Sequence, residues 1–284
     1  MTTPTRLMAG KRGLIMGVAN DHSIAWGIAK TLHHHGAELA FTYQGDAQLK
    51  RLRPLAASIN SSIMLPADVE NDDQLDQVFD RLKSEWGSLD FLVHAIAFSD
   101  KDELKGRYVD TSRTNFRRSL EISCYSFTAI AQRATRLMST EMGHRGGSMI
   151  TLSYLGASRV TPNYNVMGVA KAALEASVRY LAADLGRDGI RVNAISAGPM
   201  RTLAGSVVGD ARTMFKWNKA QAPLGISITL DQVGGAATYL LSEMSAGVTG
   251  EIHFVDAGYN IVGVPPATTL KGWQPPENGR EGES

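Results

Sequence analysis

Short runs of apolar residues alternate with longer, periodic segments along the whole chain. The short runs are typical of buried parallel strands and lie at 12–18, 37–43, 61–68, 89–97, 147–153, 190–196 and 251–257. The longer segments repeat apolar residues at helical spacing and lie near 24–35, 46–58, 72–86, 112–142, 163–186 and 230–244. This alternation predicts an α/β fold: a doubly wound parallel sheet of about seven strands with helices on both faces. The carboxyl ends of its strands would lie along one edge, where ligands bind in such sheets.

No internal repeat and no Pro/Gly linker divides the chain, which predicts one domain over 1–263. The segment 199–228 contains no predicted strand and follows the carboxyl end of one, which favours a lid or substrate loop. The last stretch, 264–284, is rich in Pro, Gly and charged residues and is typical of a mobile tail.

The composition narrows the class of protein. With 284 residues, 43% of them apolar and 20% charged, the chain can bury one large core. A formal net charge of +1 gives no electrostatic reason to expect nucleic acid or an anionic membrane as a partner. No run approaches the roughly 18 to 20 apolar residues of a membrane helix, and no signal-peptide pattern is present. A single cysteine, Cys124, excludes an internal disulfide. We therefore expect a cytoplasmic protein without stable membrane insertion.

A glycine-containing turn, GVANDHSIAWG at 17–27, connects the first strand to the first helix. Backbone N–H groups and the helix dipole make such a turn a natural anion site. Ser23 is well placed as the helix N-cap, and its hydroxyl can also reach a phosphate. The spacing of Gly17 and Gly27 is not GxGxxG, so the turn alone is equally compatible with another α/β protein. Its position in the first βαβ unit favours a dinucleotide.

Polar residues follow the second and third predicted strands. In dinucleotide sites an acidic residue after the second strand binds the ribose of NAD, and an Arg binds the 2′-phosphate of NADP. Gln44 stands here, and because a neutral amide offers no cation to a phosphate, NADH is favoured. Lys50 and Arg51 in the next helix keep NADPH open. Asp68, ending the third strand, can accept a proton from the adenine amino group, but it is equally compatible with a strand-ending cap.

Tyr164 and Lys171 lie in the helical segment 163–186. Helix positions i, i+4 and i+7 share a face, which aligns Tyr164, Gly168 and Lys171 and leaves a gap at Gly168 for a ligand edge or a ribose. A phenol beside an ammonium keeps its proton or becomes a better acid, which suits polarising a carbonyl oxygen. The simpler alternative is that Tyr164 packs in the core and Lys171 snorkels to solvent. These three residues alone favour that alternative.

Several stretches are similar to the NADH-dependent enoyl-[acyl-carrier-protein] reductases of bacterial fatty-acid synthesis, a divergent branch of the short-chain dehydrogenase/reductase superfamily. They are GVANDHSIAWGIAK, AELAFTYQ, LSYLGASRVTPNYNVMGVAKAALEASVRYLAADLG, RVNAISAGPMRT and the final strand through DAGY. The resemblance runs from about residue 8 to 263 and implies a Rossmann-type sheet. The Tyr-x6-Lys spacing preceded by SYLGA is specific to this branch. Ordinary members have Tyr-x3-Lys, with a serine thirteen residues before the tyrosine.

Other residues occupy the ordinary catalytic positions in this sequence. Met167 stands four residues before Lys171 and has no titratable group, and Tyr154 stands thirteen before Met167 in place of serine. Carbonyl reduction needs a proton at the oxygen of the carbon that takes the hydride. Conjugate reduction of an enoyl thioester instead takes hydride at C3 and places charge on the thioester oxygen two atoms away. A phenol displaced by almost a helical turn fits this longer geometry, so the spacing favours conjugate reduction.

The resemblance implies a role for each site residue. Tyr164 would stabilise the enolate by a hydrogen bond to the thioester carbonyl, Lys171 would bind the nicotinamide ribose and support the developing anion, and Tyr154 would be an auxiliary catalytic residue. The cofactor would be NADH (NAD+), bound by Gly17, Ala19, Ser23, Ile24, Gln44, Asp68, Val69, Ile96, Lys171, Met200, Thr202, Leu203 and Ala204. Ser99, Tyr154 and Tyr164 would face the enoyl group of an acyl carrier protein, and the protein would be a homotetramer that acts in fatty-acid elongation.

Two stretches depart from the family pattern. Ala97 stands where many relatives have glycine, so the wall beside the nicotinamide is a methyl group thicker and affinity for flat aromatic inhibitors is in doubt. The loop DARTMFKWNKAQAP is individual. Its Met214, Phe215 and Trp217 could line an acyl channel. Its basic residues could meet an acidic carrier protein, although a solvated helix face is favoured for Arg212, Lys216 and Lys219.

Two further features indicate no site, and two other functions remain open. His33–His35 are consecutive, and helical neighbours point about 100° apart, so they cannot close on one metal ion. Cys124 has no basic neighbour in sequence and is expected to be buried filler.

A carbonyl-reducing dehydrogenase is disfavoured by Met167 and Tyr154. A non-catalytic cofactor-binding protein is disfavoured by the intact tyrosine, lysine and glycine turn.

Overall fold

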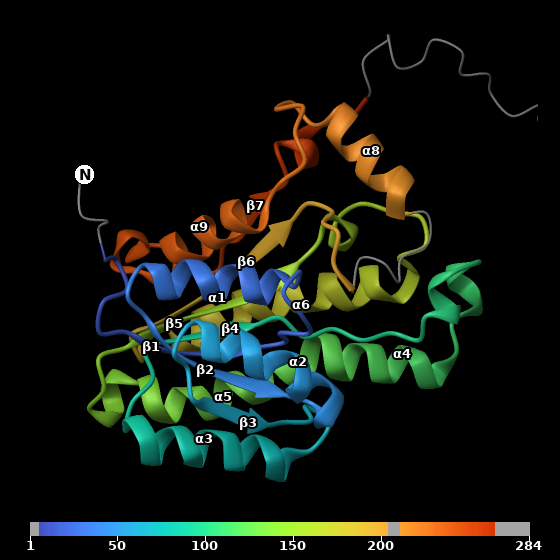
Figure 1. Ribbon diagram of the computed structural model, residues 1–284. Helices are drawn as coiled ribbons and strands as arrows, with labels where there is room; N and C mark the ends of the chain where they lie inside the picture. The colour runs from blue at the N-terminus through green and yellow to red at the C-terminus, as the bar shows by residue number, and fades with distance from the viewer. Residues whose placement is uncertain (1–5, 204–210, 265–284) are drawn as a thin grey trace, which may run out of the picture.

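A computed structural model describes residues 6–203 and 211–264 and contains one parallel sheet (Figure 1). The sheet has 7 strands in the order β3-β2-β1-β4-β5-β6-β7. The strands are β1 (Arg12–Met16), β2 (Glu38–Tyr43), β3 (Ile63–Pro66), β4 (Phe91–His94), β5 (Gly147–Ser153), β6 (Ile190–Ala197) and β7 (Ile252–Val255). Every neighbouring pair is parallel. The predicted doubly wound fold is confirmed, and its strand order reverses between β1 and β4.

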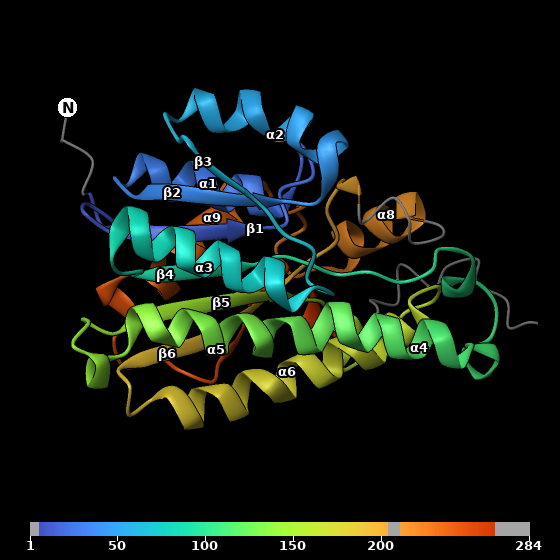
Figure 2. The same cartoon turned by 90° about the horizontal axis from the view of Figure 1, so that it is seen from below.

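Helices cover both faces of the sheet. They are α1 (Ile24–His34), α2 (Gly45–Ser58), α3 (Asp72–Trp86), α4 (Arg113–Leu120), α5 (Ser126–Met138), α6 (Asn165–Leu185), α8 (Ala211–Gln221) and α9 (Leu230–Leu241). The short 3₁₀ turns are η1 (Asp102–Leu104), η2 (Tyr108–Asp110), η4 (Thr140–Met142), η5 (Leu155–Ala157), η6 (Glu243–Ser245) and η7 (Tyr259–Ile261). Helices α1, α2 and α9 pack on one apolar core, and α3, α5 and α6 lie side by side on the other (Figure 2).

Local sequence signals explain where several helices begin. Asn71, Ser112 and Thr229 are the N-caps of α3, α4 and α9, and each side chain accepts a hydrogen bond from the backbone N–H three residues later. Thr229 forms a full capping box with Gln232. Such caps satisfy N–H groups that have no partner inside the helix, which is why these helix starts could be read from sequence.

The predicted helical segment 112–142 is not one helix. A π-helical turn, η3 (Glu121–Tyr125), separates α4 from α5, and a 3₁₀ turn closes the segment. Within the π turn, Ser123 accepts a hydrogen bond from the backbone N–H of Phe98 at 2.9 Å, and its hydroxyl also reaches the Phe98 carbonyl at 3.1 Å. The turn therefore ties the helix to the loop that leaves β4. Helical periodicity does not reveal such a turn, because it inserts only a local irregularity.

The segment 199–228 follows β6 and contains a helix, α8, which is not among the helical segments predicted from periodicity. The helix face favoured for the basic residues of this segment does lie on it. No strand occurs in its described residues 199–203 and 211–228, as expected. The predicted tail lies outside the described residues from 265 onward. In residues 6–203 and 211–264, no helix combines the length and apolar character that crossing a membrane requires.

Candidate active site

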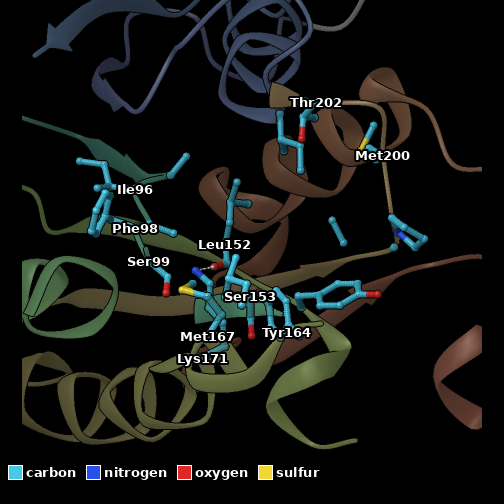
Figure 3. A pocket seen from close by; sticks show the side chains of 18 of the residues that line it. Ile96, Phe98, Ser99, Leu152, Ser153, Tyr164, Met167, Lys171, Met200 and Thr202 are labelled. Atoms are coloured by element: carbon cyan, nitrogen blue, oxygen red, sulfur yellow. Dashed lines mark hydrogen bonds between the residues drawn. The ribbon is translucent and has the colours of Figure 1, made fainter. Parts of the chain in front are cut away.

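A cavity of about 580 Å³ opens where the chain leaves β4, β5 and β6 (Figure 3). In Figure 3, Ile96, Phe98 and Ser99 lie on one side of it, and Met200 and Thr202 lie on another. The predicted site residues that line it are Ile24, Ile96, Ser99, Tyr154, Tyr164, Lys171, Met200 and Thr202. The structure thus gathers the expected catalytic and nicotinamide-end residues in one place. The remaining predicted residues of the cofactor site lie elsewhere, as described below.

Tyr164 stands immediately before α6, between two asparagines in the left-handed region. The φ angles are 58° at Asn163 and 34° at Asn165, and Asn tolerates this region better than most residues. The Asn165 side chain donates to the Glu103 carbonyl at 3.2 Å, which ties the start of α6 to the loop after β4. Tyr164 is buried, with 9% of its surface exposed. The left-handed conformations of Asn163 and Asn165 therefore fix the backbone on both sides of Tyr164, whose side chain lines the cavity.

Burial governs the acidity of this phenol. Desolvation raises the pKa of Tyr164 above its ordinary value, and the charges of Tyr154 and Glu175 raise it further. Of the two alternatives given for this phenol, the structure favours the one in which it keeps its proton. A buried, protonated phenol is a hydrogen-bond donor for an oxygen in the cavity. No hydrogen bond from the Tyr164 hydroxyl to another residue occurs within the described part of the chain.

Tyr154 packs against Tyr164, with ring centroids 5.0 Å apart in an edge-to-face arrangement. Burial and then the charge of Tyr259 raise the pKa of Tyr154 to about 12, while a hydrogen bond with Thr161 opposes this. The placement of Tyr154 beside Tyr164 in the cavity fits the auxiliary role predicted for it.

The expected gap at Gly168 is absent. A β-carbon at Gly168 would lie 2.9 Å from the Gly156 carbonyl oxygen, because turn η5 packs directly on α6 here. A β-carbon at Gly156 would in turn lie 2.4 Å from Cδ1 of Tyr164. The two glycines therefore let the SYLGA turn close over the Tyr164 ring, and the ligand space lies elsewhere in the cavity.

Gly156→Ala is expected to displace the Tyr164 ring and lower turnover by roughly tenfold or more, because small errors in catalytic geometry are costly. Steady-state kinetics with an enoyl thioester would measure the loss. Gly235→Ala is the matched control, since a β-carbon there meets nothing within 4 Å and the residue lies inside α9. An active Gly156→Ala enzyme with unchanged kcat would contradict this account of the glycine.

Lys171 is buried in α6, with 6% of its surface exposed. Its ammonium donates a hydrogen bond to the Leu152 carbonyl oxygen at 2.6 Å, and it faces the cavity (Figure 3). Burial lowers the pKa of Lys171 to about 8, whereas the charges of Cys124 and Glu175 act to raise it. The alternative in which Lys171 snorkels to solvent is therefore wrong.

The turn after β1 is built for close approach of a ligand. Gly17 has φ of 96°, and a β-carbon there would lie 2.1 Å from the Ala95 carbonyl oxygen, so no other residue fits. Ser23 is the N-cap residue of α1, but its side chain does not cap the helix. Its hydroxyl instead accepts from the backbone N–H groups of Ala19 and Asn20, each at 3.0 Å.

These hydrogen bonds show that Ser23 shapes the turn, and its predicted contact with a phosphate stays a prediction. The first N–H groups of α1, including that of Ile24, have no carbonyl within their own helix. Ile24 also lines the cavity. The start of α1 therefore fits an anionic pyrophosphate.

The turns after β2 and β3 lie along the same sheet edge but outside the cavity. The exposed Gln44 is the N-cap residue of α2, and Gln48 donates to the Val18 carbonyl at 2.7 Å. Arg51 donates to the Ala19 carbonyl at 2.8 Å, so α2 braces the turn after β1. The sequence analysis named Arg51 only as a residue that keeps NADPH open, and it did not single out Gln48. One Asp68 oxygen accepts the Glu70 N–H at 3.0 Å, which supports the turn-forming alternative.

Val69 and Leu203 are predicted cofactor residues that do not line the cavity. Val69 is half-buried and packs against one of the two apolar cores. Leu203 is half-exposed and lies outside the cavity. Ala204 lies outside the described residues. The contacts of these residues with a cofactor stay predictions.

Helix α8 supplies one wall of the cavity through Met214 and Phe215, as the acyl-channel hypothesis expects. Trp217 does not line the cavity. Its indole N–H instead donates to the Tyr259 hydroxyl at 3.1 Å and attaches α8 to the chain that follows β7. Lys216 and Lys219 are exposed, and the side chain of Arg212 lies outside the described residues.

The loop after β4 brings residues that the sequence analysis did not single out. Phe98 lines the cavity, and the Arg118 guanidinium lies 4.6 Å from its ring centroid. The Ser99 hydroxyl is within 3.4 Å of the Asn115 side chain, which holds it at the cavity. Ala97 also lines the cavity, in agreement with its expected place in the wall. Phe98 directly follows the predicted strand at 89–97, so an aromatic residue at a strand end was the sequence signal that could have revealed it.

Comparisons with known proteins agree with this geometry. A model of the Enoyl-(Acyl carrier protein) reductase family matches residues 17–260, which include the turn after β1, the cavity, Tyr164 and Lys171. The enoyl-[acyl-carrier-protein] reductase [NADH] 2 of Rhizobium meliloti (strain 1021) is 63% identical over 265 residues, covering 93% of this chain and 97% of that protein.

Two solved structures are also similar over most of their length. FabI from Candidatus Liberibacter asiaticus is 56% identical with a TM-score of 0.88, covering 91% of this chain and 98% of that one. The enoyl-(acyl-carrier-protein) reductase from Anaplasma phagocytophilum, in complex with NAD, is 56% identical with a TM-score of 0.86, covering 91% and 95%.

Proposed function

This chain belongs to the enoyl-[acyl-carrier-protein] reductase family, and we propose that Tyr164 and Lys171 are the residues with which it performs the family's reaction. It is an NADH-dependent oxidoreductase that reduces the C2=C3 double bond of trans-2-enoyl-[acyl-carrier-protein] in fatty-acid elongation. The observation that supports these roles is one buried phenol and one buried ammonium on the same cavity wall, with Met167 between them.

Bound NADH supplies the hydride that C3 of the enoyl thioester receives. Negative charge then develops on the thioester oxygen, and Tyr164 donates a hydrogen bond to it. The raised pKa of Tyr164 suits this task, because the phenol stabilises the enolate without losing its proton. The proton that C2 gains when the enolate collapses then comes from solvent. Lys171 binds the nicotinamide ribose and adds positive charge nearby, and Tyr154 packs against Tyr164 as an auxiliary.

Residues along the sheet edge would hold the cofactor, and those that follow β2 and β3 would bind its adenosine end. Gly17 and the start of α1 fit the pyrophosphate, because the glycine allows close approach and the helix presents N–H groups. Gln44 and Asp68 stand at the strand ends that would hold the adenosine. Ile96, Met200 and Thr202 enclose the nicotinamide end of the cavity.

The carrier-bound acyl chain enters beside α8, where Met214 and Phe215 provide apolar surface and Ser99 faces the substrate. The enzyme assembles as a homotetramer in the bacterial cytoplasm. Support for assembly comes from exposed apolar side chains, with Tyr125 60% and Tyr180 76% exposed on elements that pack against each other. Burying such surface between subunits removes it from water.

The function is tested by following oxidation of NADH, and separately of NADPH, with crotonyl thioester, a long-chain enoyl thioester and a simple ketone. We expect rapid NADH oxidation with both enoyl thioesters and none with the ketone. Turnover of the ketone would instead favour a carbonyl-reducing dehydrogenase. Failure to oxidise NADH with any enoyl thioester would favour a non-catalytic cofactor-binding protein. NADPH rates matching those with NADH would indicate that Arg51 accommodates a 2′-phosphate.

A further inference from the structure

Two side chains of α6 hold the end of β5 at consecutive residues. The Lys171 ammonium donates to the Leu152 carbonyl at 2.6 Å. One helical turn later, a Glu175 oxygen accepts from the Ser153 hydroxyl at 2.5 Å. Ser153 is buried and lines the cavity, whereas Glu175 is half-buried (Figure 3). A carboxylate thus lies directly behind the cavity wall, and no role described so far uses it.

The charged and titratable groups around Lys171 come from three elements. His94 on β4 is fully buried between the Thr151 and Ser126 hydroxyls, each at 2.9 Å. Burial, and then Lys171, lower the pKa of His94 to about 3, so this imidazole is neutral. Cys124 approaches from the π turn, and Glu175 lies on α6 itself. Of these groups, Cys124 has the larger effect on the pKa of Lys171 but is a thiol, and Glu175 is the carboxylate.

Lys171 needs such a partner because its environment opposes its charge. Burial is the largest influence on its pKa and favours the neutral amine. The Leu152 carbonyl offers a dipole and no net charge. A carboxylate at i+4 on the same helix face is near enough to favour the ammonium. The same carboxylate raises the pKa of Tyr164 and so helps to keep the phenol protonated.

We propose that Glu175 is a positioning residue that keeps Lys171 charged and seated against the end of β5, with Ser153 as its anchor in the cavity wall. This inference rests on the proposed role of Lys171 in binding the cofactor. Glu175 does not touch the substrate or the cofactor. Its effect is indirect, because it favours the charged form of Lys171, and Lys171 binds the cofactor.

The test measures the NADH dissociation constant by nucleotide fluorescence across the pH range in which Lys171 titrates. Wild-type affinity should fall as pH rises through about 8, because Lys171 then loses its proton. Glu175→Gln keeps an oxygen for the Ser153 hydroxyl but removes the charge, and should move this midpoint about one pH unit lower. Ser153→Ala keeps the charge but frees the carboxylate, and should cause a smaller shift in the same direction.

Asp184→Asn is the matched control, since it removes one carboxylate from an exposed position further along α6. Its midpoint should equal that of the wild type. A wild-type midpoint in Glu175→Gln, or an equal shift in Asp184→Asn, overturns the inference, and an unshifted Ser153→Ala overturns the anchor. If circular dichroism shows that Glu175→Gln does not fold, Ser153→Ala decides the outcome. Wild-type protein that binds NADH without any dependence on pH would instead overturn the proposed role of Lys171.

Discussion

Tyr164→Phe is expected to lower kcat with an enoyl thioester by about 10²–10³-fold, the usual loss when one oxyanion donor is removed. The phenol is buried, protonated and directed to the cavity, so its hydroxyl is available to the thioester oxygen when charge develops there. The ring would remain packed against Tyr154, and NADH affinity should stay near that of the wild type. Steady-state kinetics and NADH fluorescence would measure the two effects separately.

Tyr154→Phe makes the same chemical change on the neighbouring ring and is the control for Tyr164→Phe. It should cost less in kcat, because Tyr154 is assigned an auxiliary role. Loss of NADH binding in Tyr164→Phe would show that the roles of the tyrosine and the lysine are assigned wrongly. A larger loss in Tyr154→Phe than in Tyr164→Phe would move the oxyanion donor to Tyr154.

Lys171→Ala is expected to raise the NADH dissociation constant by roughly tenfold to a hundredfold, the range for removing a hydrogen bond from a charged group. The lysine is buried in α6 beside the cavity, whereas the other lysine that lines the cavity, Lys101, is exposed on the loop after β4. Fluorescence titration of the folded variant with NADH would measure the change. The turnover number at saturating NADH should fall as well, because the developing anion loses a nearby positive charge.

The alanine variant also leaves a cavity, so Lys171→Met is needed as a volume-matched control. Methionine fills most of the same space without charge, and it should weaken NADH binding as strongly as alanine does. Full affinity in Lys171→Met would show that packing, and not the ammonium, supports the cofactor. Circular dichroism of both variants would establish that the fold is retained.

The seven strands could be predicted because each is a short apolar run, fully buried in the central strands and partly buried in the edge strands β3 and β7. The structure places all of them within a few residues of the expected bounds. Helix α8 was not found from periodicity, although a helix face was favoured for its basic residues, since its segment lacks an apolar stripe as clear as those of the core helices. The break at Glu121–Tyr125 was missed because it depends on Ser123 reaching the loop after β4, a contact between distant parts of the chain.

The site shows the same division between local and distant causes. The expected gap at Gly168 was wrong because η5 folds back onto α6, and helical spacing says nothing about a neighbouring turn. The hydrogen bonds by which Ser23 shapes its own turn were likewise not predicted, because they depend on how the turn folds back on itself. The cavity residues from β4, β5 and β6 were nevertheless predicted, because parallel strands bring their carboxyl ends to one edge.

By itself, the sequence determined the sheet, the position of the cofactor turn and the displaced tyrosine, with Met167 where a carbonyl reductase has its phenol. These features follow from periodicity and spacing, which are properties of the chain. Only the tertiary structure decided the charge states on which the chemistry depends. It buries Tyr164 and Lys171, sets their pKa values in opposite directions, and brings Glu175 against Ser153. Desolvation and charge proximity arise from packing, so they exist only once the elements have come together.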